Sequence, residues 1–231
     1  MRASVRVDRR RVHKYDAVLQ LDQAEAPEQP WALHLTDAGG RFRLVGLDFD
    51  DKDASGLALN DSAECVGWLR DAGIAHLVCA SGGNAGRHVW IRLDGEGICV
   101  DEMRAMATVL QDRWKTLDLS PLSNEFHSLL RPPGSPHRHG GRSEPLSDVD
   151  AWLSQPLVSP SSWRTAVAAS VNDWNDVDVD QDNATARVLP RDDDGHPFLP
   201  GPRRPLTSLV RGLVDAPLDH SDDASSRTWS V

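Results

Sequence analysis

A short apolar run that ends in two alternating carboxylates constrains this chain more than any other feature. Residues 44–50 read LVGLDFD. Side chains alternate along a β-strand, so Asp48 and Asp50 share one face and Phe49 lies on the other. Two ionised carboxylates side by side repel each other, and beside an apolar strand they are costly unless a cation neutralises them. The pattern predicts a strand whose end binds Mg²⁺ or Mn²⁺ through oxygen ligands, and its alternative is an acidic strand end exposed to water.

Turn signals and hydrophobic periodicity place further elements around this strand. Residues 31–50 are predicted to form a β-hairpin, because the turn-forming segment Asp-Ala-Gly-Gly at 37–40 separates two apolar runs. A helix is predicted over residues 60–72, with Asn60 or Asp61 as its cap. The other expected elements are strands at 74–80 and 88–93, helices at 101–114, 148–153 and 161–171, and an irregular segment at 118–142.

The length and composition favour one substantial domain followed by a less compact tail. The chain has 231 residues, of which 39% are hydrophobic. After residue 172, runs of aspartate alternate with Pro and Gly, a composition that buries little apolar surface and predicts a linker. We expect a main domain over 1–155, short packed helices over 156–175, an acidic linker over 176–204 and the start of a helical module over 205–231, in a chain cut from a longer protein.

The formal net charge of -10 conceals two basic segments. Residues 1–14 contain five arginines and one lysine against one aspartate, and residues 131–142 contain three arginines, two histidines and no acid. Because nucleic-acid phosphates attract local positive charge, these segments are compatible with DNA binding. The alternative is an acidic protein with ordinary variation in surface charge.

Cysteine usage and hydropathy argue against several classes of protein. The three cysteines, Cys65, Cys79 and Cys99, form no CxxC pair, which argues against a disulfide framework and a thiolate zinc site. No apolar run is long enough for a membrane span, and no apolar stretch follows the basic N-terminal segment as in a secretory signal. We expect a reducing cytoplasm, and the arginine-rich, lysine-poor usage points to a bacterial host.

A glycine-rich segment lies between two of the expected strands. Residues 80–91 read ASGGNAGRHVWI. Glycines let backbone N–H groups approach phosphate oxygens, and the Arg-His pair adds charge and hydrogen bonds for a triphosphate. The segment is not a Walker A loop, because no Gly-Lys-Ser/Thr follows and a strand comes next. Taken alone, it favours a glycine hairpin with a satisfied histidine over a nucleotide site.

A second rigid loop follows Asp118. Residues 129–141 read LLRPPGSPHRHGG, in which prolines and glycines fix the backbone and leave little side-chain bulk. Such a loop can present Arg131, His137 and Arg138, and Arg131 is suited to bidentate contact with a phosphate. The alternative is a surface loop with incidental basic residues.

Two other patterns resemble known sites but lack essential residues. Alternating aspartates at 176–182 resemble the start of an EF-hand, yet Asn183 stands at the glycine position and Leu189 at the position of the closing glutamate. The paired histidines His137 and His139 resemble those of rolling-circle nucleases. Those enzymes need a tyrosine nucleophile, and Tyr15, the only tyrosine, is far from any expected helix that would present it.

Taken together, the three segments resemble the archaeo-eukaryotic primase (primase-polymerase) superfamily, in its phage and plasmid branch. The family's first motif, an apolar strand ending in acid–apolar–acid, is matched by LVGLDFD, and its second, a Ser, a Gly-rich loop and a His, by SGGNAGRH. Its third, an acid preceded by an apolar residue, is matched by Leu117-Asp118, and the Arg-x-Pro-Gly-Ser loop that often follows by RPPGSPH. The resemblance covers roughly residues 30–145.

The resemblance implies a role for each matched residue. Asp48, Asp50 and Asp118 would be catalytic and hold the metal ions, while Asp112 and Glu125 are other acids near the third position. The residues implied to bind the nucleotide triphosphate are Ser81, Gly82, Gly83, Arg87, His88 and Arg131. The residues expected to contact DNA phosphates are His137, Arg138 and Arg142.

The resemblance also implies a fold and a reaction. The fold would be α+β, with an RRM-like antiparallel sheet joined to a second small α/β unit, an active-site cleft between them and a short helical C-terminal appendage. In the reaction, a primer 3′-hydroxyl or an initiating nucleotide would attack the α-phosphate of an NTP or dNTP, with two Mg²⁺ or Mn²⁺ ions. The partners would be a single-stranded DNA template, a primer, and a helicase or helical domain downstream. Two alternatives stay open: a rolling-circle replication initiator nuclease, and a non-catalytic nucleotide- or DNA-binding module.

Overall fold

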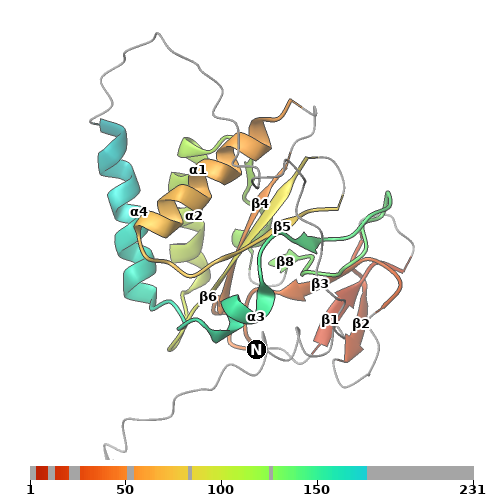
Figure 1. The fold of residues 1–231 in the computed structure, drawn as a ribbon. Coiled ribbons are helices and arrows are strands. Elements are labelled where there is room, and N and C mark those ends of the chain that lie inside the picture. Colours follow the sequence, from red (N-terminus) through yellow and green to blue (C-terminus); the bar gives the residue numbers. More distant parts are fainter. Residues whose placement is uncertain are drawn as a thin grey trace, which may run out of the picture.

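Two antiparallel sheets and four α-helices make up the part of the chain that the structure describes (Figure 1). This computed structural model describes residues 4–9, 14–20, 27–50, 55–82, 85–124 and 127–175. The strands are β1 (Ser4–Val7), β2 (Ala17–Gln20), β3 (Trp31–His34), β4 (Leu44–Phe49), β5 (Leu77–Ala80), β6 (Arg87–Arg92), β7 (Leu117–Asp118), β8 (Leu129–Leu130) and β9 (Glu144–Pro145). The helices are α1 (Leu57–Asp71), α2 (Val100–Arg113), α3 (Val149–Ser154) and α4 (Pro160–Asn175), with a 3-10 turn at Ser120–Leu122. The predicted α+β class is confirmed.

The larger sheet has an RRM-like topology. Its elements follow one another as β4-α1-β5-β6-α2-β7, and these four strands lie in the order β7-β4-β6-β5. This is the βαββαβ arrangement, which packs both helices on one face of the sheet. β9 adds a fifth strand beside β5. The smaller sheet has the order β2-β1-β3-β8.

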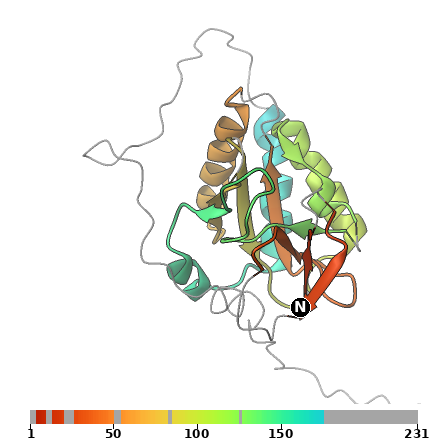
Figure 2. The same ribbon diagram turned by 90° about the vertical axis from the view of Figure 1, so that its right-hand side faces the viewer.

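Aromatic side chains fill the space between the larger sheet and its helices. Phe49 of β4 packs edge-on against Trp114, which packs against Trp68 of α1, and Trp68 packs in turn against Trp163 of α4. Large rings of this kind dominate the energetics of a core. Figure 2 shows α4 lying between α1 and α2 on this face. The cluster therefore fixes which way β4 faces, with Phe49 toward the helices.

The opposite face of β4 meets the smaller sheet. A Cβ atom on Gly46 would lie 2.6 Å from Leu130 and 3.1 Å from Leu35, so only glycine allows this close approach. Because side chains alternate, Asp48 lies on the same face as Gly46, two residues farther along the strand. The carboxylate therefore points to the side of the larger sheet that the helices leave uncovered.

The predicted single hairpin over residues 31–50 is wrong beyond its turn. Asp37 accepts hydrogen bonds from two turn N–H groups, and Thr36 pairs with Phe42. Past that pair, β3 joins the smaller sheet and β4 joins the larger one. Each strand has partners from distant parts of the chain, β1 and β8 for β3 and β6 and β7 for β4, and these non-local pairings override the local hairpin.

The predicted cap of the first helix is also wrong. α1 begins earlier, at Leu57 after Gly56, and neither Asn60 nor Asp61 caps it. Asp61 instead accepts hydrogen bonds from the backbone N–H and the hydroxyl of Thr116, at 3.0 and 2.7 Å. Its carboxylate therefore ties α1 to the segment that enters β7.

The C-terminal end of the described chain packs on the core as one helix. The short helices predicted over 156–175 are a single helix, α4, whose Arg164 forms an ion pair with Glu102 of α2. The predicted linker at 176–204, with its aspartate series, and the predicted helical module at 205–231 lie outside the described residues. Among the helices that are described, none has the length and apolar character needed to cross a membrane.

Candidate functional site

A row of polar side chains crosses the larger sheet on the face turned toward the smaller one. In the strand register Asp48 pairs with His88 on one side and with Asp118 on the other, and His88 pairs in turn with Cys79 of β5. Residues directly opposite each other in antiparallel strands share a face, with Cβ atoms about 4.5–5.5 Å apart. Strand pairing therefore places three of the predicted site residues side by side.

The imidazole of His88 is buried between two polar groups. Its Nε2 lies 3.4 Å from Oδ1 of Asp48, and the two side chains are 2% and 19% exposed. Its Nδ1 lies 3.5 Å from the hydroxyl of Ser143, which is fully buried. The sequence predicts that His88 contacts a triphosphate, and in the described structure its ring nitrogens face a carboxylate and a hydroxyl.

Asp118 is the acid that the register brings to Asp48. Its carboxylate accepts hydrogen bonds from the N–H and the hydroxyl of Ser120, at 2.9 and 2.8 Å, which fix its orientation. Of the competing acids, Asp112 is exposed and pairs with a lysine, and Glu125 lies outside the described residues.

Asp50 lies just beyond the end of β4 and is exposed. Its N–H donates to the carbonyl of Thr116 at 2.9 Å, so the pairing of β4 with the β7 segment continues past the strand end. The alternation predicted from the sequence therefore extends through Asp50, and this carboxylate lies near the same end of the sheet as Asp118.

The donor set suits a hard divalent cation in part. Across the described ranges, no three His, Cys, Asp or Glu side chains are grouped as metal ligands. Asp48 and Asp118 nevertheless offer carboxylate oxygens from neighbouring strands. Mg²⁺ is usually bound through one or two carboxylates and keeps several waters or substrate phosphate oxygens. The chemistry of this acidic pair fits such an ion, with the remaining ligands supplied by water and substrate.

Arg131 brings positive charge to the acidic end of the sheet. It follows β8, and its guanidinium interacts electrostatically with Asp48, Asp50 and Tyr15. Burial lowers the pKa of Arg131, and the neighbouring carboxylates oppose that shift. Its Nη1 is buried and has no hydrogen-bond partner among the described residues. A buried N–H without a partner is costly, and a phosphate oxygen would satisfy it.

Tyr15 is a neighbour of this site that the sequence analysis misses. It lies two residues before β2 and interacts electrostatically with Arg131, Asp8 and Asp48. Burial raises its pKa to about 12, against the opposing charge of Arg131. The phenol is therefore protonated at neutral pH. Its position outside the segment that carries the family resemblance leaves no sequence signal for it.

The glycine-rich segment and the 131–142 loop meet backbone to backbone. A Cβ on Gly82 would lie 2.2 Å from the carbonyl oxygen of Arg142, and a Cβ on Gly141 would lie 2.4 Å from that of Gly82. Both glycines have positive φ, 83° and 74°. Only residues without a side chain allow this approach. Two loops that are distant in the sequence are thus interlocked at the edge of the site.

The other residues of the glycine-rich segment are close to this contact. Ser81 is buried, and its N–H donates to the carbonyl of Gly86 at 3.1 Å. Arg87 is partly buried and donates to the same carbonyl at 2.9 Å, and burial lowers its pKa. Gly83 lies outside the described residues.

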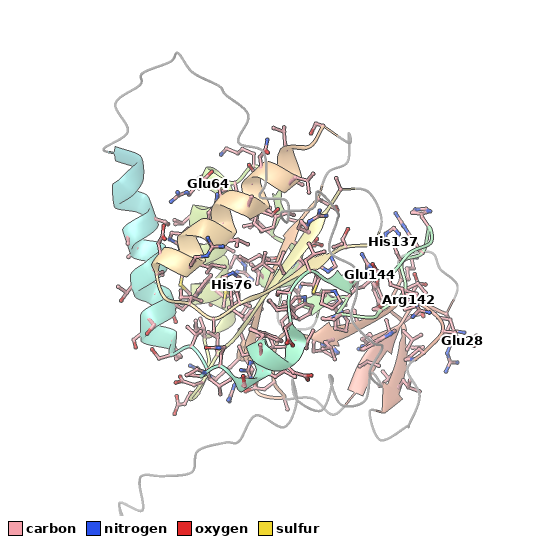
Figure 3. All side chains as sticks on the ribbon, viewed as in Figure 1. Glu28, Glu64, His76, His137, Arg142 and Glu144 are labelled. Atoms are coloured by element: carbon pink, nitrogen blue, oxygen red, sulfur yellow. The ribbon has the colours of Figure 1, made fainter. Side chains whose placement is uncertain are left out.

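The 131–142 loop is anchored to β3 by one hydroxyl. Ser135 accepts a hydrogen bond from the N–H of Trp31 at 3.1 Å and donates to its carbonyl at 2.6 Å. The predicted DNA-contacting residues lie farther out, where Arg138 and Arg142 are exposed and His137 is partly exposed. Figure 3 shows His137 and Arg142 on this loop, on the opposite side of the molecule from Glu64 of α1.

Comparison with known proteins gives little beyond this geometry. No family model matches the chain, and no curated protein matches it. Among solved structures, it is similar to the "Polymerase Domain from Mycobacterium tuberculosis Ligase D in complex with DNA", with 16% identity and a TM-score of 0.36. The similarity covers 58% of this chain and 53% of that one, so this chain spans about half the length of the structure it resembles. A likeness at this level assigns no activity to the chain.

Proposed function

We propose that this chain is a metal-dependent nucleotidyltransferase of the primase-polymerase type, acting on a DNA template. The observation that carries the proposal is the strand register, which sets Asp48 between Asp118 and His88 on the face opposite the helices. The partly buried guanidinium of Arg131, whose Nη1 is buried and unpaired among the described residues, is in electrostatic range of the same acid. Negative charge for a cation and positive charge for a phosphate thus meet at one end of a sheet.

The acids would supply the catalytic end of the site. Asp48, Asp50 and Asp118 would hold Mg²⁺ or Mn²⁺, which when bound activates the attacking hydroxyl and stabilises the leaving pyrophosphate. The protein itself forms no covalent bond to the substrate in this scheme. Its contribution is to orient the primer hydroxyl and the nucleotide and to stabilise developing charge.

The basic residues would supply the nucleotide end. Arg131 has a free donor for a phosphate oxygen, and its planar guanidinium suits bidentate contact. The other residues of the proposed triphosphate site are Ser81, Gly82, Gly83, Arg87 and His88. The choice between NTP and dNTP is left to the assay, which supplies both.

The exposed part of the 131–142 loop would hold the template. His137, Arg138 and Arg142 would contact phosphates of single-stranded DNA, which is a salt-sensitive interaction. A role in phage or plasmid replication in the cytoplasm of a bacterial host, beside a helicase or a downstream helical domain, rests on the sequence resemblance alone and belongs to the proposal.

A primer-extension and de novo priming assay with Mg²⁺ or Mn²⁺ tests the proposal. The 231-residue chain should incorporate nucleotides only with metal, and Asp50→Ala should abolish synthesis without lowering the unfolding temperature, because Asp50 is exposed. Asp112→Ala is the matched control, since Asp112 is an exposed acid outside the site. Normal synthesis by Asp50→Ala would refute the metal assignment, and loss of folding would make Asp50 structural.

The same assay separates the two alternatives. A rolling-circle nuclease would nick single-stranded DNA and lose that activity on Tyr15→Phe, whereas a polymerase should still extend primers. The raised pKa of Tyr15 disfavours the phenolate that a nucleophile needs. A non-catalytic module would bind nucleotide or DNA equally well with and without metal.

A further inference from the structure

Ser143, which no sequence motif marks, lies directly behind the histidine of the polar row. Its side chain is fully buried, and its hydroxyl is 3.5 Å from Nδ1 of His88. On its other side it forms a side-chain hydrogen bond with Cys79, which is also fully buried. Together with the 3.4 Å contact between His88 and Asp48, this gives a continuous chain Cys79–Ser143–His88–Asp48.

The carboxylate at the end of this chain fixes the direction of one of its hydrogen bonds. Burial raises the pKa of the Cys79 thiol, and its hydrogen bond with Ser143 opposes that shift. Nε2 of His88 faces the carboxylate of Asp48, and Nδ1 faces the hydroxyl of Ser143, which can either donate or accept. A carboxylate is an acceptor only, so this contact requires a proton on Nε2.

Ser143 also joins this chain to the basic loop. Its N–H donates to the carbonyl of Ser135 at 2.9 Å, and its own carbonyl accepts from Gly134 at 2.6 Å. Ser135 is the residue that anchors the loop to β3, and Arg131 belongs to the same loop. The serine is therefore held by backbone bonds on one side while its hydroxyl contacts the histidine on the other.

We propose that Ser143 is a positioning residue, which fixes the ring of His88 and through it the carboxylate of Asp48, and so sets the affinity for the divalent cation. The inference rests on the proposed function in that Asp48 is taken as a metal ligand. Outer partners of ligands typically change metal affinity or activity when they are removed. A serine that only packs the loop would leave metal affinity unchanged.

Direct Mn²⁺ binding to the full chain, measured by calorimetry, tests the proposal together with the Mn²⁺ and nucleotide dependence of primer extension. Ser143→Ala should weaken Mn²⁺ binding about 10-fold, the lower end of the effect of removing an outer partner. Nucleotide KM at saturating Mn²⁺ should change less than the Mn²⁺ affinity, although His88 also belongs to the proposed triphosphate site. Ser143→Cys keeps a weak donor of similar size and should recover part of the affinity. Ser170→Ala is the control, since Ser170 is 3% exposed and its hydroxyl donates within α4 to the carbonyl of Val167.

A double variant separates action through His88 from a direct effect. In a His88→Ala background, Ser143→Ala should cause no further loss of Mn²⁺ affinity, because the link is already cut. A further loss in that background would overturn the proposal. Unchanged Mn²⁺ affinity in the single variant, or a raised nucleotide KM with unchanged metal affinity, would overturn it as well.

The tautomer of His88, read from the ¹⁵N NMR signals of its ring, gives a test that needs neither metal nor activity. The contact with Asp48 predicts a proton on Nε2 in the wild type, and an unprotonated Nε2 would overturn the proposal even if Ser143→Ala failed to fold. Failure of the proposed function is distinguishable, because it would show as a wild-type chain that neither binds Mn²⁺ nor extends primers. In that case the role of Ser143 in metal binding falls with it.

Discussion

The acidic and basic halves of the candidate site are held in place by different means. Asp48 and Asp118 belong to paired strands, where the register sets their separation and the face on which they lie. Arg131 and the exposed arginines belong to a loop, held by the close contact at Gly82 and by the hydroxyl of Ser135. The pairing of β4 with β6 extends over six residue pairs, whereas the loop, although hydrogen-bonded within itself, meets β3 and the glycine-rich segment at a few contacts. Activity should therefore be lost at the acidic half when a charge is removed, and at the basic half when the loop is displaced.

Removal of a charge from the acidic row should have the largest effect. Asp48→Asn or Asp118→Asn keeps the shape of the side chain but removes a carboxylate, and incorporation should fall about a thousandfold, because metal catalysis contributes several kcal/mol. The unfolding temperature should change little. Steady-state primer extension and thermal unfolding measure the two quantities, and Asp112→Asn serves as control. Retained activity in both Asp48→Asn and Asp118→Asn would show that the acidic half does not depend on its charge.

A single methyl group at the loop contact should have the next largest effect. In Gly82→Ala the new Cβ meets the backbone of Arg142 at 2.2 Å, in a residue with φ of 83°. We expect a cost of about 1–3 kcal/mol in the free energy of unfolding, and a raised nucleotide KM from a displaced loop. Urea unfolding and nucleotide titration measure these quantities.

Gly140→Ala is the matched control for that contact. Gly140 also has positive φ, 101°, but a Cβ there would meet nothing within 4 Å. It should show the strain of the backbone without the displacement of the loop, so nucleotide KM should stay at the wild-type value. An equal rise in KM for both variants would mean that the contact at Gly82 does not position the loop.

Loss of the loop anchor should weaken the basic half without changing the acidic one. Ser135→Ala leaves the N–H of Trp31 buried without its partner, which should cost about 1–3 kcal/mol of unfolding free energy. Mn²⁺ affinity should change little, because strand pairing fixes the acids and the backbone bond between Ser143 and Ser135 does not need the hydroxyl of Ser135. Urea unfolding and calorimetry decide the matter, and a parallel loss of Mn²⁺ affinity would show that the two halves are not independently held.

The smallest effect is expected at the exposed arginines. Arg138→Ala and Arg142→Ala should each weaken single-stranded DNA binding, and should make the slope of log affinity against log salt shallower by about 0.7 per lost phosphate contact. Fluorescence anisotropy across a salt series measures this slope. Arg70→Ala, on α1, is a control outside the proposed template surface. Identical slopes for all three variants would show that this loop does not bind DNA.

The same division explains how much of the structure the sequence could predict. Alternation along residues 44–50 predicts correctly that Asp48 and Phe49 lie on opposite faces of a strand, because that relation is local. The predicted hairpin over residues 31–50 does not extend beyond its turn, because β3 and β4 pair with strands from distant parts of the chain. β1 is missed even though Val5 and Val7 are buried with Arg6 less so between them. A four-residue alternation is too short to be told from chance.

The site shows the same limit. The register sets Asp118 opposite Asp48, a relation that the spacing of acids along the sequence does not reveal. Ser143 and Tyr15 reach the polar row from loops, and no spacing in the sequence links them to it. The contact at Gly82 cannot be predicted from the sequence either, because glycine-rich segments occur in many kinds of turn and loop.

The central claim, that the acidic row binds a divalent cation for nucleotidyl transfer, is tested most directly by locating Mn²⁺. Crystals of the chain with Mn²⁺ and a non-hydrolysable nucleotide, measured by anomalous scattering, should show a peak bound by the Asp48 and Asp118 carboxylates, with the triphosphate reaching Arg131. A peak elsewhere, or a nucleotide bound with no Mn²⁺ at these acids, would contradict the account.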